Sequence, residues 1–237
     1  MEVDKREYYE RIAEDVRLDA FDRSRFMVEL RRAEIVADLL DVRRGAPQVL
    51  DVGCGEGLQL SVIAALNPNA RLVGIDISQR RLLSAKSRVP AMSAVCSDIE
   101  ESLGVEAGAF DRIMCSEVLE HLPEPAGLLA KIRGASKAGS LFVVTVPFRQ
   151  RIVWTRCTHC GRLTNEHLHS FDEHNLPDLV RRAGFRVERV LFPKLRGLAR
   201  TAFLPYRVWR SLHRVVDRTL LRKDKAVYMF CLARAEG

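Results

Sequence analysis

A glycine-rich turn after a short apolar run constrains this chain more than any other feature. Residues 49–57 read Val-Leu-Asp-Val-Gly-Cys-Gly-Glu-Gly, and an apolar helical pattern follows from Leu58. β-Branched residues favour a buried strand, and glycines, which lack a Cβ, permit a tight turn that reverses the chain into a helix. Backbone at such a turn can lie directly against a ligand at the helix N-terminus. The segment therefore predicts a strand-turn-helix unit that binds a ligand.

A second acidic residue, Asp76, ends the next strand-like run. Residues 72–76 read Leu-Val-Gly-Ile-Asp and follow the turn by the length of one β-α-β unit. A carboxylate at that strand end can accept hydrogen bonds from the hydroxyls of a ribose. A dinucleotide site usually carries Gly-x-Gly-x-x-Gly, whose helix end faces a pyrophosphate. This chain instead has Gly-x-Gly-x-Gly preceded by Asp51, which would repel a pyrophosphate but suits a sulfonium with an amino-acid tail.

With these residues the sequence resembles the class I methyltransferases that use S-adenosylmethionine (SAM), over residues 45–192. The resemblance implies an α/β, Rossmann-like methyltransferase fold with a mostly parallel seven-stranded sheet and helices on both faces. It also implies SAM as cofactor, with acids at the ends of three successive strands. The residues that it assigns to SAM binding are Asp51, Gly53, Cys54, Gly55 and Gly57 in the first loop, Asp76 and Ile77 after the second strand, Ser97, Asp98 and Ile99 after the third, and Ser116 after the fourth.

Length and composition fit one large α/β domain with additions. The chain has 237 residues, of which 47% are hydrophobic and 29% charged. We expect a helical lead-in over 1–44, then a methyltransferase domain over 45–237 with insertions at 149–170 and 194–223. The lead-in either covers one edge of the SAM cleft, as in the resembled family, or simply packs against the domain. Within the domain we expect strands over 91–96 and 225–233 and a helix over 171–183.

The compartment is inferred from what the sequence lacks. It has no apolar run long enough to span a bilayer, and its first residues lack the layout of a signal peptide. Cys54, Cys96, Cys115 and Cys231 lie in or beside expected buried strands, spaced as single small apolar residues. We therefore expect a cytoplasmic protein, with attachment to a membrane surface as the alternative.

A Glu-x-x-Glu-His pattern follows the fourth expected strand, at Glu117, Glu120 and His121. On a helix these positions share one face, where they suit Mg²⁺ or another divalent ion that lowers the pKa of a hydroxyl acceptor. The sequence here is similar to ubiquinone-pathway O-methyltransferases and small-RNA 3′-end 2′-O-methyltransferases, which bind a metal at this pattern. The latter add a later histidine, here His167 or His169. Without a metal, the acid and the histidine would cap a helix or line the acceptor pocket. We take Glu117, His121 and His169 as the catalytic candidates.

A second pattern predicts zinc. Cys157 and Cys160 form a Cys-x-x-Cys-Gly turn, and His167 and His169 would complete a tetrahedral Cys2His2 site. A redox pair and two unrelated thiols are the competing interpretations. Both metal predictions require the same histidines, so both sites cannot be complete. We favour zinc with the cysteines.

The second insertion, 194–223, carries the excess positive charge of a chain whose formal net charge is +7. Its interpretation stays open between a lid over the acceptor, a dimer contact, an anionic membrane surface and a nucleic-acid backbone. The oligomeric state is correspondingly a monomer or a homodimer. The basic residues are Lys194, Arg196, Arg200, Arg207, Arg210, Arg214, Arg218, Arg222 and Lys223, with Asp217 as the acid among them.

The function expected from these features is SAM-dependent methyl transfer to a small-molecule or lipid-linked acceptor, at oxygen. No Asn-Pro-Pro-Tyr follows the fourth strand, which makes the resemblance to DNA-amine and protein-glutamine methylating enzymes poor. The alternatives are a metal-dependent RNA 2′-O-methyltransferase, with nucleic acid as partner, and a SAM-binding module without catalysis.

Overall fold

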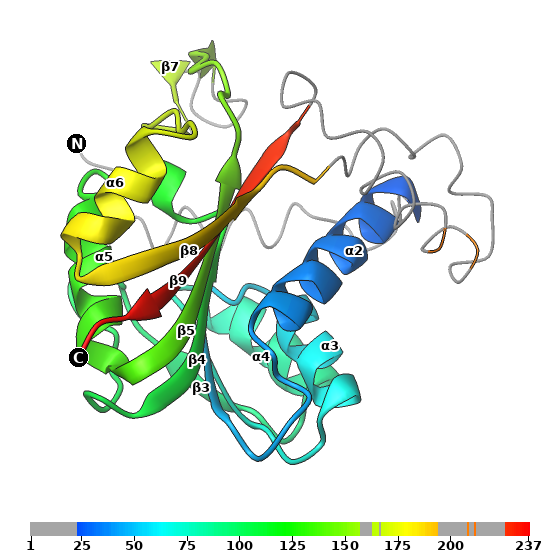
Figure 1. Ribbon diagram of the computed structural model, residues 1–237. Coiled ribbons are helices and arrows are strands. Elements are labelled where there is room, and N and C mark those ends of the chain that lie inside the picture. Colours follow the sequence, from blue (N-terminus) through cyan, green and yellow to red (C-terminus); the bar gives the residue numbers. More distant parts are fainter. Residues whose placement is uncertain (1–22, 157–162, 166, 194–207, 209–210, 212–225) are drawn as a thin grey trace.

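A single seven-stranded sheet forms the centre of the computed structural model (Figure 1). Its strand order is β3-β2-β1-β4-β5-β9-β8, and every pairing is parallel except those of β9 with β5 and β8. The predicted mostly parallel seven-stranded α/β fold is therefore confirmed. The structure describes residues 23–156, 163–165, 167–193, 208, 211 and 226–237. The strands of the sheet are β1 (Gln48–Val52), β2 (Arg71–Asp76), β3 (Ser93–Cys96), β4 (Phe110–Ser116), β5 (Ser136–Pro147), β8 (Phe185–Leu191) and β9 (Tyr228–Ala235).

Helices cover both faces of this sheet, as Figure 1 shows. Along β4, Ile113 and Cys115 pack into the cluster that holds α5 and α6, whereas Met114 packs into the cluster that holds α2, α3 and α4. This alternation is the two-residue period of a strand that is buried on both sides. The helices are α2 (Arg23–Leu39), α3 (Leu58–Leu66), α4 (Gln79–Arg88), α5 (Pro125–Ala135) and α6 (Asn175–Arg182), with a short 3-10 turn η1 (Leu119–His121).

The bounds of one helix and of the last strand differ from the sequence-based expectation. The helix expected over 171–183 begins only at Asn175, because the Asp172 carboxylate accepts the backbone N–H groups of His174 and Asn175 and forms a turn first. The last strand, expected over 225–233, runs from Tyr228 to Ala235, in register with β5 from Pro147 onward. A local turn thus sets the start of α6, whereas pairing with β5 sets the bounds of the last strand.

One cysteine departs from the expected burial. Cys54, Cys115 and Cys231 are buried, but Cys96 is exposed. It ends β3, which begins at Ser93 rather than at residue 91 and is an edge strand with one neighbour, β2. An edge strand of four residues has less cover than the strands at the centre of the sheet.

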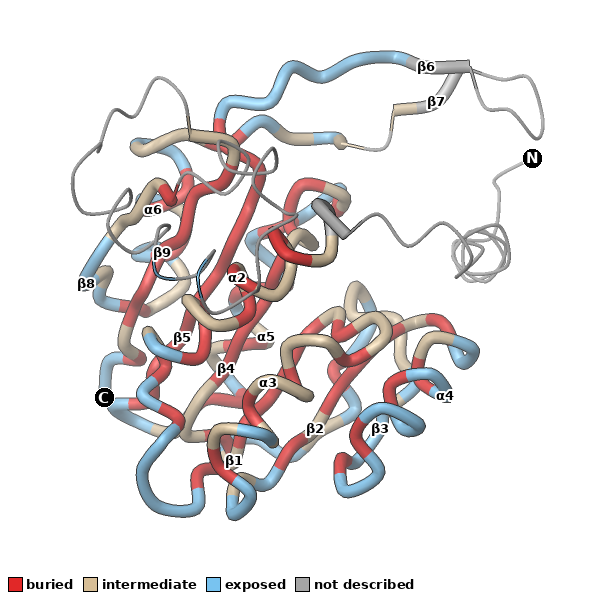
Figure 2. The backbone as a smooth tube through the Cα atoms, turned by 90° about the vertical axis from the view of Figure 1, so that its right-hand side faces the viewer, coloured by how far each residue is buried: buried red, intermediate tan, exposed pale blue. Residues whose placement is uncertain are grey.

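Each insertion follows the carboxyl end of a strand of the sheet. The first follows β5 and the second follows β8. After β5, the chain forms a two-stranded antiparallel ribbon, β6 (Thr155–Arg156) and β7 (Leu163–Thr164), which is reached through a stretch that Figure 2 shows as largely exposed. The expected basic helix over 194–223 lies outside the described residues, apart from Val208 and Ser211, as does the lead-in before Arg23. Within the described parts of the chain, no helix combines the length and apolarity needed to cross a bilayer.

Candidate active site

The glycine turn leaves bare backbone at the carboxyl end of β1. Gly53, Gly55 and Gly57 all have positive φ angles, of 76°, 51° and 74°. A Cβ on Gly53 would lie 2.5 Å from Val118 Cγ2, whereas a Cβ on Gly55 would meet no atom within 4 Å. Glycine at position 53 is thus required by packing, and Gly55 faces open space. A ligand can approach the backbone at Gly55 more closely than any side chain would permit.

Asp76 fixes this turn from the neighbouring strand. Its Oδ2 accepts the Gly55 N–H at 2.9 Å, and its Oδ1 accepts the Ser78 N–H at 2.9 Å. Ser78 in turn caps α4, since its Oγ accepts the backbone N–H of Arg81. The carboxylate therefore lies beside the open backbone of Gly55, at the strand end where the resemblance expects a ribose.

Asp51 is a buried acid with no hydrogen-bond partner among the described residues. Its side chain is 1% exposed, and neither oxygen has a hydrogen bond among the described residues. Burial, together with the charge of Asp76, raises the pKa of Asp51 to about 8, against the lowering effect of Arg32. Buried carboxylates are normally paired or hydrogen-bonded. The site thus has an unmet requirement for a cation or a donor beside the glycine turn.

The residues assigned to adenine follow β3, next to β2 in the sheet. Ser97, Asp98 and Ile99 are half-buried, and Asp98 Oδ1 accepts the Glu100 N–H at 2.9 Å. Ile77 lies opposite, where its carbonyl accepts the Cys96 thiol. Since Asp76 and Cys96 are paired in the β2–β3 ladder, these groups share one edge with the glycine turn. The structure thus brings the acids of three successive strand ends together.

Two further predicted residues complete this side of the site. Ser116, at the end of β4, donates its hydroxyl to Gln59 Oε1 at 3.2 Å, which links β4 to α3. Cys54 is buried, and burial together with Asp51 raises the pKa of its thiol well above the ordinary value. Cys54 therefore remains a neutral packing residue and has no thiolate character.

The expected helix through Glu117, Glu120 and His121 is wrong. Glu117 has φ of 55°, in the left-handed region, and only the 3-10 turn η1 follows it. Its Oε1 accepts the Thr145 hydroxyl at 3.1 Å, and its Oε2 lies 3.5 Å from Arg32 Nη1. Burial raises the pKa of Glu117 to about 7, against the lowering effect of Arg32. Glu117 is therefore held by α2 and β5.

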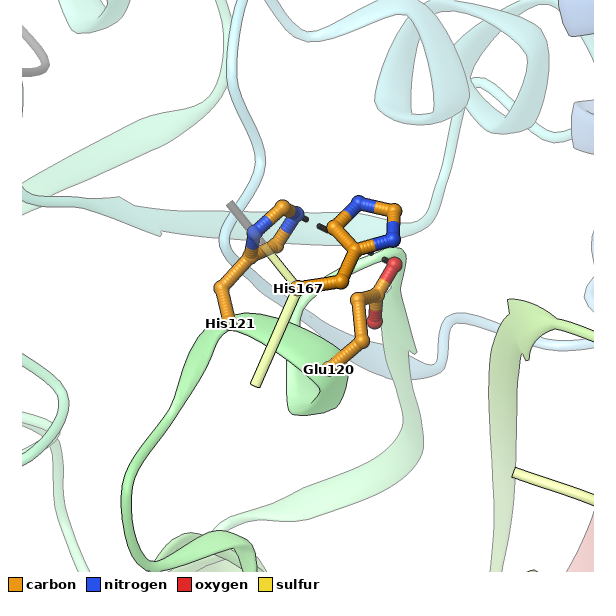
Figure 3. Close-up of side chains that lie close together, drawn as sticks. All are labelled: Glu120, His121 and His167. Atoms are coloured by element: carbon orange, nitrogen blue, oxygen red, sulfur yellow. Dashed lines mark ion pairs between the residues drawn. The ribbon is translucent and has the colours of Figure 1, made fainter. Parts of the chain in front are cut away.

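His167 joins Glu120 and His121 instead (Figure 3). One ligand atom from each of the three side chains lies within 4.8 Å of the others. Glu120 Oε1 is 3.9 Å from His121 Nε2, and the two imidazole rings meet edge to face with centroids 4.6 Å apart. Glu120 is buried, neither of its oxygens has a hydrogen bond among the described residues, and its pKa is raised to about 8, chiefly by burial. Two imidazoles and a carboxylate in this arrangement suit a divalent transition-metal ion.

His169 lies next to this cluster but outside its ligand set. Its backbone N–H donates to the Glu120 carbonyl at 3.3 Å, and its Nε2 lies 3.3 Å from the Pro123 carbonyl. Cys157 and Cys160 lie outside the described residues, so the predicted zinc site stays a prediction. His167, which both metal predictions share, is placed with Glu120.

Arg32 of α2 is the residue that sequence reasoning missed. It forms ion pairs with Glu29 and Glu117, and its guanidinium lies over the Tyr228 ring, 5.3 Å from the centroid. Its charge lowers the pKa of Asp51, Glu117 and Glu120. The sequence could have indicated that Arg32 faces the domain. Arg32 lies four residues from Val28 and four from Val36, which are both buried, so it is on the apolar stripe of the helix.

Comparison with known proteins agrees with this geometry. A family model described as a methyltransferase domain matches residues 21–190. The ubiquinone biosynthesis O-methyltransferase of Xanthomonas axonopodis pv. citri is 29% identical over 185 residues, which cover 73% of this chain and 72% of that one. The enzyme of the same name from Hahella chejuensis is 38% identical over 117 residues, covering 46% and 48%. An uncharacterised 37.1 kDa protein in a Streptomyces fradiae transposon is 36% identical over 48% of this chain, a match that covers 33% of that protein.

Solved structures share the fold at low identity. The [4+2]-cyclase SpnF has a TM-score of 0.63 at 21% identity, covering 87% of this chain and 81% of that one. A SAM-dependent methyltransferase from Mesorhizobium loti has a TM-score of 0.61 at 19% identity, covering 85% and 96%. The family match and these structures together identify the chain as a member of the class I SAM-dependent methyltransferase family.

Proposed function

We propose that this protein binds SAM at the carboxyl ends of β1, β2 and β3 and methylates a small-molecule or lipid-linked acceptor at oxygen. The observation that carries the proposal is the buried, unpartnered carboxylate of Asp51 beside the open backbone of Gly55. Relatives named for small acceptors support it, namely the ubiquinone biosynthesis O-methyltransferases and a trans-aconitate 2-methyltransferase of Methylobacterium radiotolerans, 34% identical over 50% of this chain and 46% of that one.

The residues present fit SAM. Neither oxygen of Asp51 has a hydrogen bond within the described part of the chain, and the amino group of the methionine part would supply one. Asp76 lies beside Gly55 at the end of β2, where it would accept the ribose hydroxyls, and Asp98 follows the next strand, where it would accept the adenine amino group. Gly55 leaves room for close contact with the backbone. These side chains would hold the cofactor between β3 and β4.

Bound SAM supplies a methyl group on a positively charged sulfur. The protein has to hold an acceptor oxygen in line with that group, and positioning of this kind lowers a barrier by about 7–11 kcal/mol. A hydroxyl acceptor also has to lose its proton. We assign the proton to Glu117 Oε2, because Glu117 directly follows β4, which pairs with β1, and is oriented by Thr145 and Arg32. Arg32 stabilises the ionised carboxylate until it accepts the proton.

We further propose that Glu120, His121 and His167 bind a divalent cation on the acceptor side. Support comes from their three ligand atoms within 4.8 Å and from the buried Glu120 carboxylate, which has no hydrogen bond among the described residues. The mixed nitrogen and oxygen set suits Zn²⁺, Mn²⁺ or Fe²⁺ better than Mg²⁺, which prefers oxygen ligands. Such an ion would lower the pKa of an acceptor hydroxyl.

SAM binding is tested by a pair of glycine substitutions. Gly45 and Gly55 both have positive φ, and a Cβ on either meets no atom within 4 Å. Both alanine variants therefore carry the same backbone strain, about 1–2 kcal/mol. Calorimetric titration with SAM should show an affinity lower by about tenfold or more for Gly55→Ala, and wild-type affinity for Gly45→Ala. Wild-type SAM affinity in both variants would place the cofactor elsewhere.

The metal proposal is tested with Glu120→Gln, because the alternative zinc site at Cys157 and Cys160 does not need Glu120. Removal of a residue that only orients a metal ligand lowers metal affinity by about 10–100-fold. Glu120→Gln removes a ligand itself, so it should lower metal affinity by at least the same factor. Titration of chelator-treated protein with Mn²⁺ and Zn²⁺ measures it, with Glu124→Gln, an exposed neighbour, as control. Unchanged metal affinity in Glu120→Gln would exclude this cluster as the site.

A further inference from the structure

Three consecutive large apolar side chains are exposed on the arm that leads to β6. Ile152, Val153 and Trp154 have 44%, 60% and 65% of their surface exposed, and Leu168 on the returning arm has 41%. Figure 2 shows this arm as a largely exposed stretch that extends from the body toward β6. Contiguous exposed apolar side chains mark interaction sites with a protein or a membrane.

The charge around this run favours an anionic partner. Residues 149–165 contain no aspartate or glutamate, but four arginines: Arg149, Arg151, Arg156 and Arg162. Arg149 is paired with Glu173 at 2.7 Å, which ties the base of the arm to the body, and Arg151 is exposed beside the apolar run. Tryptophan and arginine together are typical of segments at the interface of a bilayer, where phosphate groups lie above apolar chains. The absence of acidic residues over 149–165 is what favours an anionic bilayer over a protein partner.

The arm is connected directly to the acceptor side of the candidate site. It leaves the sheet at Phe148, which forms a bridge with Phe171, and returns through His167. The backbone N–H of Leu168 donates to the Glu120 carbonyl at 2.7 Å. A surface that receives the apolar run would therefore contact an arm whose returning part is bonded to Glu120 through Leu168.

We propose that Ile152, Val153 and Trp154 insert into the headgroup region of an anionic bilayer, with Arg151 bound to lipid phosphate. The apolar side chains leave water, and the guanidinium keeps its charge at the phosphate level. A lipid-linked acceptor would then reach the Glu117 side of the site from the membrane. This last consequence rests on the proposed function, whereas the membrane contact itself does not.

Vesicle co-sedimentation of the full chain tests the contact. The vesicles are phosphatidylcholine with or without phosphatidylglycerol, at low and physiological salt. We expect wild-type protein to bind the anionic vesicles preferentially, and less at the higher salt. The triple variant Ile152→Ser/Val153→Ser/Trp154→Ser should bind at least about tenfold more weakly, because it lacks the three exposed apolar side chains that the bilayer would bury. Leu83→Ser on α4 removes a side chain that is 62% exposed and should bind as wild type does.

Fluorescence locates the contact within the chain. Anionic vesicles should shift the tryptophan emission to shorter wavelength, and Trp154→Phe, which keeps an apolar ring, should lose most of this shift while it still binds. Absence of wild-type binding would overturn the proposal and favour a protein partner for the arm. Wild-type binding by the triple variant would also overturn it and assign the membrane contact to another segment. Calorimetric titration of the same proteins with SAM tests the proposed function separately. A lack of SAM binding would contradict the proposed function and would leave the membrane contact unaffected.

Discussion

Asp51→Asn is expected to weaken SAM binding by about 100-fold or more, because it removes the charge that a cationic ligand group would pair with in a buried site. Calorimetric titration measures the affinity, and the asparagine keeps the size of the side chain. Wild-type affinity in this variant would mean that Asp51 does not contact the cofactor.

The same substitution is expected to change how stability depends on pH. The ordinary pKa of Asp51 is 3.8, and burial raises it to about 8 in the folded protein. Between these values the folded protein holds a proton that the unfolded chain has lost, so the free energy of unfolding falls as pH rises and levels off above about 8. The asparagine of the variant carries no such proton. Between pH 5 and pH 8, wild type should lose about 4 kcal/mol relative to the variant.

Urea unfolding of ligand-free wild type and Asp51→Asn at these two pH values measures that difference. If the difference in unfolding free energy between the two proteins is the same at both pH values, the pKa of Asp51 is not raised.

Proton release on SAM binding is a second test of the same pKa. If SAM pairs with ionised Asp51, binding near pH 7 should release close to one proton. Calorimetry in buffers of different ionisation enthalpy detects that release, and Asp51→Asn should lack it.

Glu117→Gln is expected to lower kcat by about 10²–10⁴-fold with little change in SAM affinity, since a positioned base typically contributes that factor. The amide can still accept the Thr145 hydroxyl, so the geometry at the end of β4 should persist. Radiolabelled methyl transfer to a catechol or phenol acceptor measures the rate, with Glu124→Gln as the exposed control.

An unchanged rate in Glu117→Gln would show that Glu117 only positions other groups. Wild-type protein that binds SAM but transfers no methyl group to hydroxyl acceptors would favour the alternative of a SAM-binding module. The likeness to a protein named a cyclase shows that this fold is not confined to proteins named methyltransferases.

The fold was predictable from local sequence because its signals are local. The glycine turn and the helix that follows it from Leu58 each depend on neighbouring residues, and both appear where expected. The exposure of Cys96 was not predictable in this way. It depends on β3 being an edge strand, which is a property of the strand order.

The acceptor side was harder to predict because its contacts are distant in sequence. Glu-x-x-Glu-His is compatible with a helix, but the Glu117 backbone N–H donates to the Thr145 carbonyl at 2.9 Å and so continues the pairing of β4 with β5. Because Glu117 extends this strand pairing, it does not lie on one helix with Glu120 and His121, as the first metal prediction required. The approach of Arg32 to Glu117 and of His167 to Glu120 likewise follows from tertiary packing.

The position of β9 has a consequence for how the protein is made. It follows the second insertion in sequence but lies between β5 and β8 in the sheet. A ribosome therefore releases β5 and β8 before the strand that joins them exists. Until residues 228–235 emerge, the apolar edge of β5 has no neighbour, and unpaired edges of this kind invite association between nascent chains.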